Sequence, residues 1–188
     1  LLKGYAAFAE WDLSHFDQVV TGKYPAWAID HPNHRVWMLH PLRGLYDRYP
    51  AGLPDRLPRP LDPDLQAALE LPGRLSNGAA AGPIIDEATN LIGRAAERLG
   101  AEHPDLAIPS PLARMLVQRL DHGLLAATRV RSHAAISEAV AQRPNWFPAG
   151  VTPQVVHPPL DTRWAKTLST VALPERRTSD PLKVLSVG

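Results

Sequence analysis

The chain has no cysteine among its 188 residues, and this absence excludes disulfide frameworks, thiolate zinc sites and cysteine nucleophiles together. An excess of one charge sign is also lacking, because 20 lysines and arginines nearly balance 19 aspartates and glutamates. We therefore expect no nucleic-acid partner and no acidic tail. No apolar run approaches the roughly 20 residues that cross a bilayer. Together these features lead us to expect a cytoplasmic protein.

The motifs of two common enzyme classes are absent as well. No Gly-x-Gly-x-x-Gly follows an apolar segment, which argues against a dinucleotide-binding enzyme. No Gly-x-Ser-x-Gly occurs, which argues against a serine hydrolase with a nucleophile elbow. Three histidines, His31, His34 and His40, lie close in sequence. Their spacing gives no clear third ligand with supporting groups, so we expect no metal site.

What the chain does contain is an alternation of short apolar runs and amphipathic segments. Apolar residues make up 45% of the sequence, which is enough for a packed core. Serine before proline at 110–111, and Ser137, are typical helix N-caps. We predict strands over 18–21, 35–39, 131–136, 154–157 and 183–188, and helices over 24–29, 84–99, 112–124 and 138–142. The pattern predicts an α/β fold with a parallel sheet.

The segment 48–82 has a different texture, because seven prolines and several glycines interrupt it or border it. We predict an irregular surface insertion there, with one helical turn over 64–71. A substrate lid is the alternative for this segment, since long loops are often functional.

Several ordered segments resemble glycosyltransferase family 4. The first contains a strand and proline turn, a second strand that ends in His40, and an Arg-Gly-x-Tyr-Asp loop at 43–47. The second is a small-residue strand followed by a serine and a Val-x-x-Arg helix, and the third is a strand that ends in two prolines. The segments span 16–26, 31–34 and 36–47, then 135–143 and 146–148, then 155–161, with a further strand at 184–188.

The resemblance implies the GT-B architecture, in which two Rossmann-like domains face each other across a cleft. We expect a Rossmann-like parallel sheet with flanking helices that forms the N-terminal, acceptor-side half of this fold and is incomplete at both ends. The expected division is a partial N-terminal domain over 1–161, a linker over 162–182 and the first strand of a donor-binding domain over 183–188.

The resemblance also implies a function. We expect transfer of a sugar, with retention of configuration, from a nucleotide-sugar donor to an acceptor that is a cell-envelope glycan, a lipid or a small metabolite. No cofactor or essential metal is expected, a fuller protein could contact a membrane peripherally, and this piece alone is expected to be inactive. The alternative is a non-catalytic α/β binding module.

Candidate site residues come from strand ends, because ligands of open α/β sheets lie at the carboxyl ends of strands. His40 is the catalytic candidate, and it could bind the donor sugar or position the acceptor hydroxyl. Lys23, Arg43 and Gly22 are candidates for substrate binding, with Arg43 suited to phosphate. Alternatively, His40 only caps a strand end, and Lys23 and Arg43 are solvated loop charges. Asp47 could orient Arg43 or Tyr46, which would be a structural role.

Overall fold

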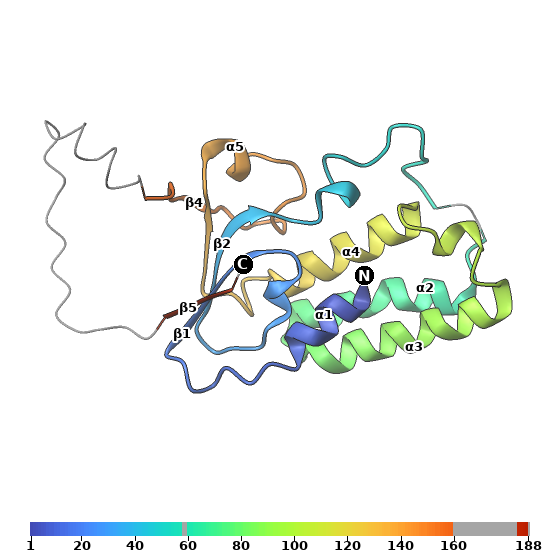
Figure 1. The fold of residues 1–188 in the computed structure, drawn as a ribbon, viewed down its shortest axis with the longest axis horizontal. Coiled ribbons are helices and arrows are strands. Elements are labelled where there is room, and N and C mark those ends of the chain that lie inside the picture. Colours follow the sequence, from blue (N-terminus) through green and yellow to red (C-terminus); the bar gives the residue numbers. More distant parts are fainter. Residues whose placement is uncertain (58–59, 160–183, 188) are drawn as a thin grey trace, which may run out of the picture.

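Five parallel strands form the single sheet of the computed structural model, which describes residues 1–57, 60–159 and 184–187. Their order across the sheet is β4-β3-β2-β1-β5 (Figure 1). The strands are β1 (Gln18–Lys23), β2 (His34–His40), β3 (Ser132–Ala135), β4 (Gln154–Val155) and β5 (Val184–Val187). The predicted α/β class and parallel pairing are thus confirmed. The strand predicted over 154–157 is shorter than expected, since β4 ends at Val155.

The strand pattern follows from burial on one face of the sheet. In β2 the side chains of His34, Val36 and Met38 are buried, while those between them are more exposed. Val36 and Met38 belong to the same core cluster as the buried residues of the helices. Side chains in a strand alternate between faces, so one face of β2 contributes to this core.

The helical layer consists mainly of α1 (Leu2–Ala9), α2 (Pro63–Glu70), α3 (Ala81–Leu99) and α4 (Pro111–Leu124), which lie together on one side of the sheet in Figure 1. Short turns of helix connect the elements. They are η1 (Ala26–Ala28), η2 (Arg43–Leu45), η3 (Leu71–Asn77), η4 (Pro104–Leu106) and α5 (Glu138–Ala141). No helix in the described ranges is both long and apolar enough to cross a membrane.

Several ends of the predicted helices are confirmed, whereas α3 begins three residues earlier than predicted and the helix predicted over 24–29 is only the short turn η1. The hydroxyl of Ser110 accepts the backbone N–H of Ala113 at 3.1 Å, and α4 begins there. Ser137 caps α5 in the same way, through the N–H of Val140 at 3.3 Å. Helix α3 ends at Gly100, whose φ of 88° lies in a region that favours glycine. By contrast, α1 was not predicted, because an eight-residue helix without a side-chain cap has little local signal.

The predicted irregular surface insertion over 48–82 is corrected by the structure. Residues 63–77 form α2 and η3, and their Leu65, Leu69 and Leu75 are buried in the main core. Pro63 occupies the first turn of α2, where a proline starts a helix rather than breaking one. The helical turn predicted over 64–71 is thus confirmed as α2, and the correction concerns its place, which is in the core and not in a surface insertion.

The last strand also differs from expectation. Residues 184–187 do form a strand, but β5 pairs with β1 in the same sheet, with Gln18 opposite Val184 and Thr21 opposite Val187. In the described residues, β5 therefore extends the sheet formed by the other four strands. The predicted linker over 162–182 lies outside the described residues.

A buried carboxylate joins the helical layer to the loops that follow the strands. Asp121 of α4 accepts hydrogen bonds from the hydroxyl of Tyr5, from Nε1 of Trp27 at 2.8 Å and from the hydroxyl of Tyr46 at 2.7 Å. These donors come from α1, η1 and the residue after η2. Burial raises the pKa of Asp121 to about 6, although the three hydrogen bonds favour the charged form. The side chain thus fixes four segments around one point.

We predict that Asp121→Ala destabilises the fold by about 3 kcal/mol, because it leaves three buried donors without an acceptor and opens a cavity. Asp121→Asn is the matched control. Its remaining oxygen can serve Tyr5 and Trp27, and the hydroxyl of Tyr46 can turn to accept from the amide, so we expect a loss below about 1 kcal/mol. Urea unfolding at pH 7 measures both. Equal losses in the two variants would contradict the role assigned to the carboxylate oxygens.

His34 is a second buried polar residue at the sheet. Its Nε2 lies 2.9 Å from Oγ1 of Thr21. Burial lowers the pKa of His34 from 6.5 to about 3, with further contributions from the positive charge of Arg129 and from His31 and His133. The imidazole is therefore neutral in the folded protein at pH values where it would be charged in the unfolded chain.

His34 and Asp121 give opposite pH dependences to stability. Since the folded pKa of His34 is lowered, its contribution is present above pH 6.5 and is lost as pH falls toward 3. Since the folded pKa of Asp121 is raised, its contribution is present below pH 3.8 and is lost as pH rises through 6. When the pH falls from 7 to 5, His34 lowers the free energy of unfolding by about 2 kcal/mol, whereas Asp121 raises it by about 1 kcal/mol.

We therefore predict that His34→Gln and Asp121→Asn change the pH profile in opposite directions. On going from pH 7 to pH 5, His34→Gln should gain stability relative to the unmodified chain, because its acid-labile contribution is gone. Asp121→Asn should lose more stability than the unmodified chain over the same interval, because the gain from protonation of Asp121 is gone. The free energy of unfolding in urea at the two pH values measures both shifts, and parallel profiles for all three proteins would refute this assignment.

Candidate functional site

The carboxyl ends of β1 and β2 bring two of the predicted site residues together. Lys23 and His40 are register partners at the ends of these adjacent strands. His40 is exposed, and its Nδ1 lies 3.0 Å from the carbonyl oxygen of Pro41. A carbonyl only accepts, so Nδ1 carries the hydrogen and, in the neutral ring, the Nε2 lone pair is left for another group. The arrangement gives this edge an imidazole that can accept a proton or a hydrogen bond.

Gly22, the third candidate, has a packing reason to be glycine. The residue is buried, and a Cβ atom there would lie 2.6 Å from Cδ1 of Leu39 and 3.1 Å from the carbonyl oxygen of Trp37. The pairing of β1 with β2 also shifts register between Thr21 and Lys23. Gly22 therefore permits the close approach of two strands, which accounts for a glycine at this position by packing alone.

Arg43 and Asp47 form the polar part of the loop after β2. Nη2 of Arg43 contacts Oδ2 of Asp47 at 2.5 Å, and Nε lies 3.1 Å from both carboxylate oxygens. Hydrogen bonding from Arg43 lowers the pKa of Asp47. The expectation that Asp47 orients Arg43 is thus confirmed. A second guanidinium, that of Arg143, pairs with the same carboxylate and lies over the ring of Trp146 at 4.8 Å from its centroid.

A hollow of about 290 Å³ opens beside this carboxylate. It is lined by Tyr46, Asp47, Arg114, Gln118, Arg143, Pro144, Asn145 and Trp146. Arg114 pairs with Asp55, and Gln118 donates to the carbonyl oxygen of Leu45 at 3.0 Å. Counting Arg43, three guanidinium groups face two carboxylates, which leaves a positive excess. Such a surface suits a ligand with hydroxyl groups and an anionic group.

Arg114 and Arg143 were not among the predicted site residues. Arg143 belongs to the Val-x-x-Arg helix of the resemblance, which was its one signal in the sequence. Its contact with Asp47 joins residues 96 positions apart, and Arg114 meets Asp55 across 59 positions. Local patterns carry no information on contacts of this range.

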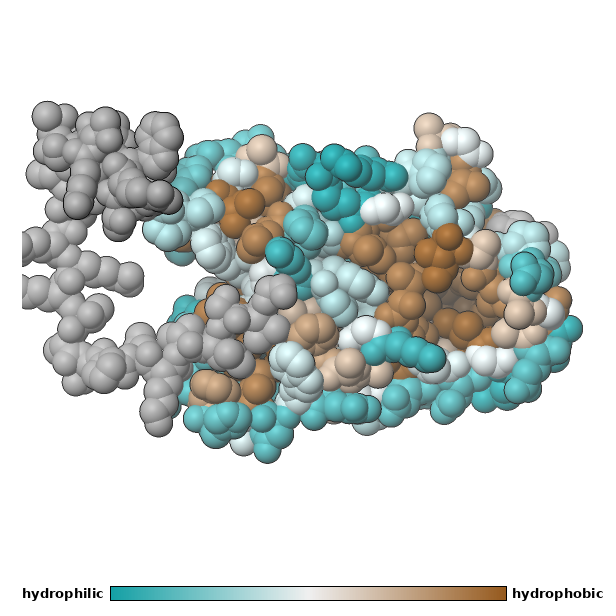
Figure 2. Space-filling model, in the orientation of Figure 1, coloured by the Kyte–Doolittle hydropathy of each residue, from teal (hydrophilic) through white to brown (hydrophobic). Residues whose placement is uncertain are grey.

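A more apolar hollow lies elsewhere. It is lined mainly by Leu1, Leu2, Ile92, Leu106, Ile108, Leu112 and Leu116. Figure 2 shows apolar surface on this face of the helical layer, around α4. The hollow has few polar groups that could orient a substrate, so the carboxyl edge remains the candidate functional site.

The three histidines considered for metal binding do not converge. Nδ1 of His31 accepts the backbone N–H of Asn33 at 3.1 Å, and its Nε2 lies 3.0 Å from the carbonyl oxygen of Phe16. His34 is buried against Thr21, while His40 lies at the opposite end of β2. Residues 1–57 and 60–159 contain no group of three or more histidine, aspartate or glutamate side chains that could hold a metal ion.

Comparison of the chain with protein-family models, with curated proteins and with solved structures gives no match.

We predict that Gly22→Ala destabilises the protein by about 1–3 kcal/mol, because the added methyl group must displace Leu39 and the backbone at Trp37. Gly44→Ala is the matched control in the next loop, where nothing lies within 4 Å of an added Cβ. We expect its effect to stay within about 0.5 kcal/mol. Thermal and urea unfolding compare the two. Similar stability of both variants would show that packing does not explain Gly22.

Proposed function

We propose that this chain is the acceptor-side part of a glycosyltransferase of GT-B architecture, which moves a sugar from a nucleotide-sugar donor to an acceptor hydroxyl. The observation that carries the proposal is His40. It is exposed at the carboxyl end of a central strand, beside Lys23, with Nδ1 engaged and Nε2 left for a ligand. The order of the segments that resemble glycosyltransferase family 4 supports the same function.

The geometry supports a positioning mechanism. In the reaction, the bond between the sugar anomeric carbon and the donor phosphate oxygen breaks, and a bond from that carbon to the acceptor oxygen forms. The proton of the acceptor hydroxyl leaves with the nucleotide phosphate. Nε2 of His40 can accept a hydrogen bond from that hydroxyl or from a hydroxyl of the donor sugar, which holds the reacting oxygen in place.

The arginine pair on Asp47 would contribute binding rather than proton transfer. Arg43 and Arg143 are held in place by a shared carboxylate, so their remaining donors have a fixed direction. Guanidinium groups match phosphate and carboxylate oxygens in pairs. We assign to them an anionic group of the acceptor or the donor phosphate, with Lys23 as a further positive charge at the same edge.

A second candidate function is a non-catalytic α/β binding module. It is favoured by the ion pairs at the hollow, where Arg114 and Arg143 each contact a carboxylate, and by Arg43, which pairs with Asp47 beside them. Under this hypothesis the edge binds a ligand and His40 only donates or accepts a hydrogen bond. Turnover separates the two functions.

We predict that His40→Ala lowers kcat for sugar transfer by about 100-fold or more, a typical loss for a group that positions or moves a proton. The assay uses the complete gene product that contains this chain, a panel of nucleotide sugars with hydroxyl acceptors, and mass spectrometry of products. His15→Ala, which removes an exposed histidine before β1, is the control and should leave kcat unchanged. Ligand binding without transfer to any acceptor would favour the binding module, and unchanged turnover in His40→Ala would refute the assigned role.

A further inference from the structure

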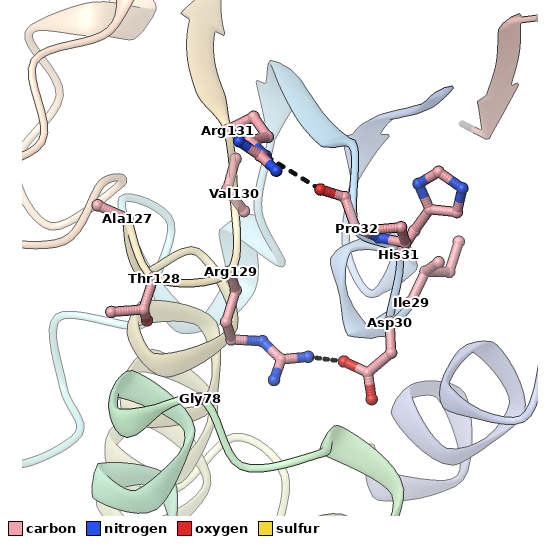
Figure 3. Close-up of a pocket in the computed structure, with 10 residues that line it drawn as sticks. All are labelled: Ile29, Asp30, His31, Pro32, Gly78, Ala127, Thr128, Arg129, Val130 and Arg131. Atoms are coloured by element: carbon pink, nitrogen blue, oxygen red, sulfur yellow. Dashed lines mark hydrogen bonds and ion pairs between the residues drawn. The ribbon is translucent and has the colours of Figure 1, made fainter. Parts of the chain in front are cut away.

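A second polar cavity, of about 440 Å³, lies at the amino ends of the strands, opposite the end at which His40 lies. Its walls are the loop 29–32 before β2, Gly78 after η3, and the segment 127–131 between α4 and β3 (Figure 3). Both loops precede strands, so the cavity lies at the amino ends of β2 and β3. It is separate from the site around His40 and Asp47.

Arg129 is the buried charge of this cavity. Its side chain is only 8% exposed, and its guanidinium pairs with Asp30 and donates to the carbonyl oxygen of Ala79 at 2.5 Å. Among the described residues, its Nε is the only buried side-chain nitrogen or oxygen without a hydrogen-bond partner. The protein therefore does not fully satisfy the donors of this group.

Asp30 is the one carboxylate among the residues that line this cavity, and each of its oxygens already accepts a hydrogen bond. Oδ1 pairs with Arg129, and Oδ2 accepts the backbone N–H of Ala81 at 3.0 Å, where α3 begins. Figure 3 shows that Arg129 and Asp30 meet at the lower side of the view and that Arg131 lies above them, in the same connecting segment as Arg129.

Arg131 supplies the accessible charge. It is exposed, and its Nε donates to the carbonyl oxygen of Pro32 at 3.1 Å, which draws the guanidinium toward the loop 29–32. Within the described part of the chain, its two terminal nitrogens make no hydrogen bond. Two guanidinium groups thus border a cavity that is lined by one carboxylate. The groups that can bind a ligand are the two terminal nitrogens of Arg131, which are hydrogen-bond donors.

The other polar side chains of the cavity add no competing charge. Both ring nitrogens of His31 are engaged, with Asn33 and Phe16. The hydroxyl of Thr128 donates to the carbonyl oxygen of Ser76 at 2.9 Å. Ile29, Pro32 and Val130 provide apolar walls beside the arginines.

We propose that this cavity binds a small organic phosphate, with its phosphate group on Arg131 and in the field of Arg129, and its organic part against the apolar walls. Guanidinium forks match phosphate oxygens, and a buried positive charge attracts an anion more strongly than an exposed one does. A ligand there would join three segments that are distant in sequence. The proposal does not depend on the glycosyltransferase function.

The test is titration of the 188-residue chain with glycerol 2-phosphate and with inorganic phosphate, followed by ¹H–¹⁵N NMR and calorimetry at constant ionic strength. We expect saturable binding that shifts the backbone amides of 29–31 and 127–131. Arg131→Ala should weaken the affinity at least tenfold. Arg131→Lys, which keeps the charge but loses the fork, should give an intermediate loss. Tighter binding of glycerol 2-phosphate than of inorganic phosphate would support contacts between the cavity walls and the organic part of the ligand.

Two controls locate the ligand. Arg74→Ala removes an exposed arginine of η3 and should leave the affinity reported by the amides of 29–31 and 127–131 unchanged. Arg43→Ala distinguishes binding at the other arginine cluster, because any loss that it causes there should not appear in those amide shifts. Loss of binding in Arg43→Ala instead of Arg131→Ala would place the phosphate at the carboxyl edge and overturn the proposal. Equal effects of chloride and phosphate, or unchanged affinity in Arg131→Ala, would also overturn it.

Discussion

The hydrogen bonds to Asp121 are the constraint on which the arrangement of this protein depends. A carboxylate in the core is costly to bury, and it is tolerated because three donors converge on it. Tyr5 and Trp27 attach α1 and η1 to α4, and Tyr46 attaches the loop after β2. Since Tyr46 directly precedes Asp47, the position of the arginine pair at the candidate site is set from inside the core. The site is thus an outer part of a buried polar network.

This connection explains how a loop without regular structure can hold charged groups in place. Asp47 receives Arg43 from its own loop and Arg143 from the segment after α5. Exposed ion pairs are worth little by themselves, so the two pairs alone would not fix the loop. Fixation comes from Tyr46 on one side and from the packing of Arg143 on buried Trp146 on the other.

The parts of the structure that sequence could predict are those with local causes. Spacing of apolar residues revealed α3 and α4, and Ser110 and Ser137 marked helix starts through hydrogen bonds to residues three positions away. His40 could be assigned to a strand end because Pro41 follows it. The role of Asp121 as a buried acceptor could not be recognised from the sequence, because its three partners are distant from it along the chain. Tyr46 is 75 positions away, Trp27 is 94 and Tyr5 is 116. Likewise, nothing local indicates that β5 pairs with β1, or that a proline-rich segment packs Leu65 and Leu69 into the core.

Both ends of the parallel strands obtain positive charge from arginine side chains, and at the amino end this follows from the direction of the elements. Helix α4 ends at Leu124, shortly before the amino end of β3, and a helix C-terminus presents carbonyl groups that repel anions. Positive charge at that edge must come from side chains, and Arg129 and Arg131 follow α4 within its connection to β3. The N-terminus of α3 already donates a backbone N–H to Asp30. Asp30, the partner of Arg129, therefore also accepts a hydrogen bond from the backbone of α3. Nε of Arg129 is left without an acceptor among the described residues.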